Sequence, residues 1–119
     1  MLQVSRDAFL IHYNDALAEL KHADALTQPQ DVSLEGKFYL GAGGTMGFAI
    51  VDGDIRYLFS TYKGKGAYLV KQAKRYGGRT LDCFDGFLTF FYALHGFQEV
   101  KREPNWVAGE PDVVWMELA

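Results

Sequence analysis

A basic segment with two glycines is the part of this sequence best suited to bind an anion. Residues 60–69 read STYKGKGAYL, and the window from 60 to 79 holds half of the 12 Lys and Arg residues with no Asp or Glu. Glycines let backbone N–H groups approach a phosphate closely, and lysines add full positive charges. The segment therefore predicts a pyrophosphate site. The alternative is that Gly64 and Gly66 only shape a tight turn and that the later basic residues form a solvated helix face.

Other residues with reactive side chains are weaker candidates. The single cysteine, Cys83, lies in an apolar strand with no histidine placed to activate it, so we expect a small buried hydrophobe rather than a nucleophile. No Cys/His group has metal-ligand spacing, and neither G-x-G-x-x-G nor Gly-Lys followed by Ser or Thr occurs. We therefore expect no metal, no P-loop and no dinucleotide fingerprint.

The N-terminal part of the sequence predicts a helix and a hairpin. Apolar residues recur at three- and four-residue steps between residues 5 and 25, which is the pattern of an amphipathic helix. Asp52-Gly53 separates two apolar strands, and this dipeptide tolerates the positive φ angles of a type I′ hairpin turn. The glycines at 41–44 predict a further turn. The strands expected here are residues 2–4, 37–40, 47–51 and 55–59.

The C-terminal part predicts strands alternating with helices. A strand, a helix and a strand joined by short loops make a βαβ unit, so we expect strands 55–59 and 80–84 to run parallel. Asp85 is placed to cap an apolar helix, whose Phe87, Phe90, Phe91 and Leu94 we expect in the core. The resulting architecture is a mixed α/β sheet with helices on both faces. The elements expected here are helices 67–76 and 86–95 and strands 80–84, 97–101 and 113–117.

Size and charge narrow the classes of protein that this chain can represent. A chain of 119 residues predicts one domain, residues 1–119, with a real core. The net charge of −3 disfavours binding to nucleic acid over the whole surface, although a local anion patch stays open. One cysteine fits a reducing, intracellular setting, and the sequence shows neither a secretory signal nor a tract that would span a bilayer.

Two motifs taken together resemble the GNAT-fold N-acetyltransferases. In that family the loop that binds the coenzyme A pyrophosphate follows Arg/Gln-x-x-Gly-x-Gly/Ala, and residues 61–66 (TYKGKG) match both glycines. The family also ends a later helix with Phe-Tyr-x-x-x-Gly-Phe, which residues 91–97 (FYALHGF) reproduce. The resemblance spans residues 37–118. It implies an α/β, GNAT-like acyl-CoA N-acyltransferase fold with a shortened N-terminal half, because one full helix has room where most members have two.

The resemblance also implies roles for individual residues, with acetyl-CoA as a substrate and no metal. The backbone of residues 62–67 would hold the pyrophosphate, and the strand end at 58–60 would run along the pantetheine arm. Tyr92 stands where many members keep the general acid that protonates the departing thiolate. Asp85 takes the place of an Asn that often contacts the coenzyme. The implied coenzyme-binding residues are Leu58, Phe59, Ser60, Tyr62, Lys63, Gly64, Lys65, Gly66, Ala67 and Asp85.

The sequence departs from the family pattern near the implied site. Thr61 replaces the Arg or Gln that begins the loop pattern, and Asp85 puts a carboxylate near an anionic ligand. The strand at 55–59 has no Glu where many relatives keep a base, so either a water-mediated base such as Asp54 or none at all would serve. These departures bear on coenzyme affinity and on whether catalysis is retained.

The leading hypothesis is a cytoplasmic N-acetyltransferase that moves an acetyl group from acetyl-CoA to an amine of a small molecule, a protein or a nucleobase. The alternative is a catalytically inactive GNAT-like binding protein that keeps the coenzyme as a structural ligand. A third, weaker hypothesis is a nucleic-acid contact through the basic residues 63–79. We expect no membrane partner, and a homodimer would follow if the last strand pairs its exposed edge with a second chain.

Overall fold

The computed structural model describes residues 1–20 and 26–119. The chain divides into two compact units, Met1–Gly78 (unit 1) and Arg79–Ala119 (unit 2), and each is described here by itself. In the described ranges the chain forms seven strands and three α-helices, which confirms the expected mixture of α and β structure. The expected parallel pairing of residues 55–59 with 80–84 joins the two units and stays a prediction, as does a single domain over residues 1–119.

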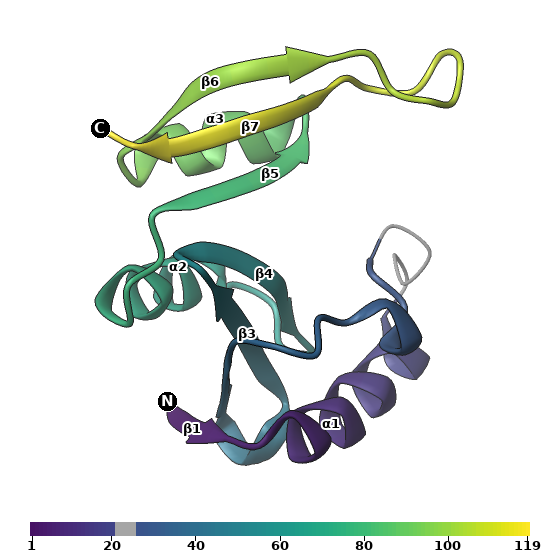
Figure 1. Cartoon of the computed structure of the whole chain (residues 1–119), viewed down its shortest axis with the longest axis vertical. Helices are drawn as coiled ribbons and strands as arrows, with labels where there is room; N and C mark the ends of the chain where they lie inside the picture. Colours follow the sequence, from purple (N-terminus) through teal and green to yellow (C-terminus); the bar gives the residue numbers. More distant parts are fainter. Residues whose placement is uncertain (21–25) are drawn as a thin grey trace. The chain divides into compact units, whose positions relative to one another are not determined.

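Unit 1 is a four-stranded antiparallel sheet with two α-helices (Figure 1). Its strands lie side by side in sequence order: β1 (Leu2–Val4), β2 (Lys37–Gly41), β3 (Met46–Val51) and β4 (Asp54–Ser60). The helices are α1 (Arg6–Glu19), which follows β1, and α2 (Gly66–Arg75), which follows β4. Two 3₁₀ turns, η2 (Pro29–Asp31) and η3 (Ala42–Gly44), precede β2 and β3.

The two helices of unit 1 pack on opposite faces of its sheet (Figure 1). Side chains alternate along a strand, so Phe38 and Leu40 of β2 join the cluster under α1 while Tyr39 points to the other face. There the ring of Tyr39 stacks on that of Tyr76, the residue that ends α2, with 4.5 Å between the ring centroids. Within unit 1, the sheet is therefore covered on both faces, as expected.

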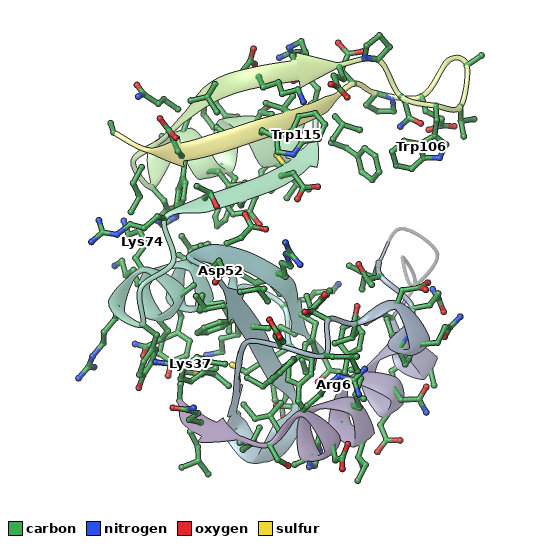
Figure 2. The ribbon with its side chains drawn as sticks, viewed as in Figure 1. Arg6, Lys37, Asp52, Lys74, Trp106 and Trp115 are labelled. Atoms are coloured by element: carbon green, nitrogen blue, oxygen red, sulfur yellow. The ribbon has the colours of Figure 1, made fainter. Side chains whose placement is uncertain are left out.

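Helix α1 is held in unit 1 by buried aromatic side chains and by hydrogen bonds of its first residues. Phe9 and Tyr13 are fully buried one turn apart, with 5.4 Å between stacked rings. The N–H of Ala8 donates to Ser5 Oγ, and this hydrogen bond caps the helix. The Arg6 guanidinium donates to the carbonyls of residues 32 and 33, which ties α1 to the segment before β2 (Figure 2). The helix is shorter than predicted, because Leu20 already has an extended backbone; residues 21–25 lie outside the described residues.

We expect Tyr13→Phe to flatten the alkaline fall in stability. Burial, with a smaller contribution from the Tyr57 phenol, raises the pKa of Tyr13 from 10.0 to about 12, and its hydroxyl donates to the Thr27 carbonyl at 2.6 Å. The stabilisation from the protonated phenol is fully present below about pH 10 and is lost as the pH rises through about 12. Urea unfolding between pH 8 and 12 measures this slope, and equal slopes for parent and variant would contradict the assignment.

The β3–β4 hairpin confirms the predicted type I′ turn. Val51 pairs with Asp54, and the two turn residues have positive φ angles, 49° at Asp52 and 81° at Gly53. The strand β4 differs from expectation in its middle. Ala49 pairs with Arg56 and Gly47 pairs with Phe59, so β4 has one residue more than β3 between these pairs, which is a β-bulge.

Tyr57 occupies the bulge in a strained backbone conformation. Its φ is 55°, a left-handed value that a bulky side chain rarely adopts and that costs about 1–3 kcal/mol. The Tyr57 hydroxyl accepts a hydrogen bond from the Ser33 N–H at 2.9 Å, and its ring packs against Phe9 and Tyr13. These contacts hold the bulge. As a result, Ile55 lies against Gly78 beside α2, whereas Phe59 lies in the cluster under α1.

Unit 2 is a three-stranded antiparallel sheet with one helix on one face (Figure 1). Its elements are β5 (Thr80–Phe84), α3 (Phe87–Leu94), β6 (Phe97–Glu103) and β7 (Val113–Leu118), and the strand order is β5-β7-β6. The last strand therefore has no exposed edge, contrary to expectation, because β7 pairs with β5 on one side and with β6 on the other. The edge strand on that side of the sheet is β6, which pairs with β7 alone in this order.

Helix α3 corrects two sequence predictions. Its N-cap is Gly86 rather than Asp85: the helix begins at Phe87, and the N–H of Gly86, whose φ is 133°, donates to the Thr89 hydroxyl. Three of the four residues expected in the core are instead largely exposed: Phe87 (74%), Phe90 (64%) and Leu94 (69%). The helix is apolar all round, so its sequence pattern does not indicate which side packs on the sheet.

Candidate functional site

The predicted anion-binding segment is the connection from β4 to α2. Lys63, Gly64 and Lys65 are all exposed. Gly64 has a φ of 77°, a conformation that favours glycine, and an added Cβ there would meet nothing within 4 Å. Glycine is thus required by the backbone conformation and not by close packing. The connection presents bare backbone with open space beside it, between two lysines.

The start of α2 is open to an anion. In the described part of the chain, no side chain caps this helix at Lys65, and its first turn contains no acidic residue. The first backbone N–H groups of a helix lack intrahelical partners and carry partial positive charge. The charges of Lys63 and Lys65 add to that field. An anion with several oxygens suits this arrangement better than any neutral ligand.

Two hydroxyl side chains fix the connection. The N–H of Tyr62 donates to Ser60 Oγ at 3.0 Å, and this hydroxyl donates in turn to the Tyr62 carbonyl at 2.8 Å. The N–H and the hydroxyl of Thr61 both donate to the Thr45 carbonyl, at 2.9 and 3.2 Å. Thr61, which replaces the Arg or Gln of the family pattern, therefore anchors the connection to the residue before β3.

The end of β4 offers mainly backbone to a ligand. The Phe59 side chain is only 3% exposed and belongs to the cluster under α1, so only its backbone is available. Leu58 and Ser60 are partly exposed. The bulge at Tyr57 and Leu58 lies directly before this end, and the extra residue of a bulge is left out of the regular ladder of hydrogen bonds.

Asp85 is bound to an arginine that the sequence analysis did not single out. Its carboxylate accepts from Arg102 at 2.6 Å and from the Thr89 hydroxyl at 3.1 Å, and these contacts hold the pKa of Asp85 below its ordinary value. Arg102 also contacts Glu99 and Asp112. The carboxylate of Asp85 is therefore ion-paired within unit 2, in a cluster where one arginine serves three carboxylates. No motif marks Arg102, because it lies 17 residues away on β6.

Tyr92 packs inside unit 2. Its ring meets that of Phe97 edge-on, with 6.0 Å between centroids, and burial, with smaller contributions from the Cys83 thiol and the Asp82 carboxylate, raises its pKa to about 12. In the described residues, the hydroxyl has no hydrogen-bond partner, and no side-chain oxygen is both fully buried and unpartnered. The phenol therefore keeps its proton at neutral pH and can donate it.

Cys83 is a buried residue of the unit 2 core, as expected. It is 9% exposed, and its sulfur lies 4.0 Å from that of Met116. Burial, followed by the nearby charges of Asp82 and Asp85, raises its pKa to about 11, which keeps the thiol protonated and unreactive at neutral pH. Among the described residues, no three His, Cys, Asp or Glu side chains are grouped to hold a metal, and no helix is long and apolar enough to cross a membrane.

A cavity beside the connection contains residues that the sequence analysis missed. It has a volume of about 480 Å³ and is lined by Ala42, Met46, Tyr62, Lys65 and Tyr68. Tyr62 and Lys65 were predicted as coenzyme-binding residues, whereas Tyr68, Met46 and Ala42 were not. No sequence signal marks Ala42 and Met46, because they come from η3 and β3 and reach this place only through the antiparallel pairing of β3 with β4.

The structure brings together the predicted residues that precede and begin α2. Residues 58–67 all belong to unit 1, at the end of β4 and the start of α2. Asp85 and Tyr92 both belong to unit 2. The coenzyme-binding and catalytic roles of all these residues stay predictions.

A similar fold occurs in a protein from Lactobacillus plantarum that is described as a "putative N-acetyltransferase". The match to its crystal structure has a TM-score of 0.55 at 14% sequence identity and covers 94% of this chain and 89% of that chain. No protein-family model matches the sequence, and no curated protein does. This chain thus has a mixed α/β fold of the GNAT-like kind, as predicted, and at this identity the likeness concerns the fold alone.

Proposed function

We propose that this protein binds acetyl-CoA and transfers its acetyl group to an amine. The observation that carries the proposal is the connection Lys63-Gly64-Lys65-Gly66, where exposed lysines, a glycine with positive φ and an uncapped helix start meet. The likeness to an N-acetyltransferase structure supports the same function. The proposal includes a cytoplasmic location and an acceptor amine on a small molecule or a protein.

The connection fits the pyrophosphate of the coenzyme. Backbone N–H groups from Gly64 to Ala67 would donate to phosphate oxygens, and Lys63 and Lys65 would offset their charge. No Asp or Glu lies between residues 60 and 79 to oppose this binding. The backbone of residues 58–60 would hold the pantetheine arm by hydrogen bonds. The negative charge of Asp85 is only partly offset, because Arg102 shares its single positive charge among Asp85, Glu99 and Asp112.

The residues present also suit acyl transfer to an amine. When bound, acetyl-CoA supplies an activated acyl group in the form of a thioester. Attack by an amine places negative charge on the carbonyl oxygen, and a backbone N–H freed by the bulge at Tyr57 and Leu58 would stabilise that charge. Tyr92 would donate its phenolic proton to the sulfur as the carbon–sulfur bond breaks, and the proton lost by the attacking nitrogen would pass through water and restore the phenol.

The hypothesis of Asp54 as a base loses support in the structure. Asp54 forms an ion pair with Arg56 at 2.9 Å, and it begins β4, three residues before the bulge at Tyr57 where the proposal places the reacting carbonyl. At about 3.3 Å per residue this separation is roughly 10 Å, beyond proton transfer that is direct or passes through one water. We propose that the acceptor instead arrives as a free amine. No observation favours the inactive alternative, which is an outcome of the experiment below.

Acetyl-CoA should raise the melting temperature of the parent protein by several degrees. A ligand at about 100 times its Kd adds about 2.7 kcal/mol to the free energy of unfolding. The double variant Lys63→Glu/Gly64→Val should show no such shift, because Glu repels the phosphates and Val disfavours a φ of 77°. Thermal melting of each protein, with and without coenzyme, measures the effect.

The matched control is Lys71→Glu, which makes the same charge change on the exposed face of α2 and should keep the shift. The parent is then assayed for thiol release from acetyl-CoA with a panel of amines. A shift without thiol release would identify the inactive coenzyme-binding alternative. No shift at millimolar acetyl-CoA would refute coenzyme binding altogether.

A further inference from the structure

We infer that the cavity lined by Ala42, Met46, Tyr62, Lys65 and Tyr68 takes the purine nucleotide half of the coenzyme. The base would stack on the rings of Tyr62 and Tyr68. This inference rests on the proposed function. It adds recognition of the base by side chains of this chain, which the anion-binding connection alone does not supply. It also predicts that the nucleotide half binds without the acyl arm.

The aromatic rings of the cavity are available for stacking. Tyr62 is 56% exposed and Tyr68 is 44% exposed, although both rings are large and apolar. Across the described residues, neither ring lies against another aromatic ring, in contrast to Tyr13, Tyr39 and Tyr57, which are all packed in ring clusters. Stacking on a base would cover ring surface that now meets water.

The volume and lining of the cavity suit an uncharged aromatic ring joined to an anion. Its volume of about 480 Å³ lies within the usual range of small-molecule sites, about 300–1,000 Å³. Met46 is 3% exposed overall and offers an apolar wall. The lining contains one cation, Lys65, and no carboxylate. A cationic ligand would therefore be disfavoured, and an aromatic ring that carries phosphate would be favoured.

The cavity is continuous with the proposed phosphate site. Tyr62 and Lys65 belong to both, and Tyr68 lies in the first turn of α2, whose N–H groups face the phosphates. The hydrogen bonds between Ser60 and Tyr62 fix the backbone that carries the first ring. One ligand can thus place its phosphates at the helix start and its base in the cavity.

The test titrates adenosine 3′,5′-bisphosphate, the nucleotide half alone, into the whole chain by calorimetry. We expect Tyr62→Ala and Tyr68→Ala each to weaken its binding about 5- to 150-fold, the usual loss when a stacking ring is removed. Tyr68→Phe keeps the ring and should keep the affinity. Inorganic pyrophosphate, which has no base, should bind Tyr68→Ala as it binds the parent. Uridine 3′,5′-bisphosphate, whose ring is smaller, should bind the parent more weakly.

Several outcomes would overturn the inference. They are unchanged binding of the adenosine ligand by both alanine variants, an equal loss for adenosine bisphosphate and pyrophosphate, equal affinity for the uridine ligand, or no binding of adenosine bisphosphate at millimolar concentration. Its failure is distinguishable from that of the proposed function. If the parent turns over acetyl-CoA but Tyr68→Ala binds the nucleotide as the parent does, only the stacking site is refuted. If the alanine variants lose nucleotide binding but the parent shows no turnover, only the acetyl transfer is refuted.

Discussion

Phe9→Ala is expected to lower the free energy of unfolding by about 3–5 kcal/mol. The Phe9 ring is fully buried and contacts the rings of Tyr13, Phe38 and Phe59 at centroid distances of 5.2–5.8 Å. Its removal leaves a cavity between α1 and the sheet that the surrounding rings cannot fill without moving. Because whole domains are stable by only about 5–15 kcal/mol, a large part of the stability would be lost. Urea unfolding followed by circular dichroism measures it.

Ile11→Ala is the matched control for Phe9→Ala. Ile11 lies on the same helix but is 63% exposed, so its truncation should change the free energy of unfolding by less than about 0.5 kcal/mol. If Phe9→Ala costs no more than this control, the cluster under α1 does not hold the helix to the sheet. The assignment of α1 to the core of unit 1 would then be wrong.

Tyr92→Phe is expected to lower the turnover number of acetyl transfer by about 100-fold while leaving coenzyme affinity unchanged. The ring packing against Phe91 and Phe97 is kept, and only the proton donor is lost. General acids contribute about 10²–10⁴-fold, and burial moves the pKa of Tyr92 to about 12, far from neutral pH, so the low end of this range applies. Steady-state thiol release gives turnover, and calorimetry gives affinity.

The pH profile provides a second reading of the same variant. Because the pKa of Tyr92 is about 12, deprotonation of this phenol should not reduce the parent's rate between pH 7 and 10. Tyr39→Phe, which removes the hydroxyl of a buried tyrosine in unit 1, should leave turnover unchanged. Equal turnover for Tyr92→Phe and the parent would leave Tyr92 as a packing residue only.

The sequence was sufficient for the elements that local chemistry determines. The β3–β4 hairpin was predictable because Asp52 and Gly53 tolerate the positive φ angles that a two-residue turn requires. The start of α1 was predictable because Ser5 is a good N-cap residue. In both places a short run of residues determines the backbone, and no distant contact is needed.

Features set by distant contacts were not predictable. Regular alternation places Ile55, Tyr57 and Phe59 on one face of β4, but the bulge turns Ile55 toward α2 and Phe59 toward α1. The partner of Asp85 was also missed, since Arg102 comes from the edge strand of unit 2. An apolar helix such as α3 gives no periodic signal, so its buried side could not be read from sequence.

The backbone segment of the candidate site was predictable from the sequence, but the side chains that line the cavity beside it were not. The glycines and lysines of residues 63–66 follow one another in sequence, so their common position needed no tertiary information. The cavity needed it, because Met46 reaches Tyr62 and Tyr68 only through the pairing of Met46 with Ser60. Local motifs therefore predict the candidate anion-binding connection, and the sheet register places the cavity beside it.

The bulge in β4 also determines which insertions and deletions the strand tolerates. Tyr57 behaves as an inserted residue that does not change the strand register on either side of it. Its deletion would place Leu58 alone opposite Phe48. The pairs of Arg56 with Ala49 and of Phe59 with Gly47 would be preserved. A length change between the bulge and Ser60 has no such compensation. It would turn Phe59 out of the core and move the candidate anion-binding connection out of its place before α2.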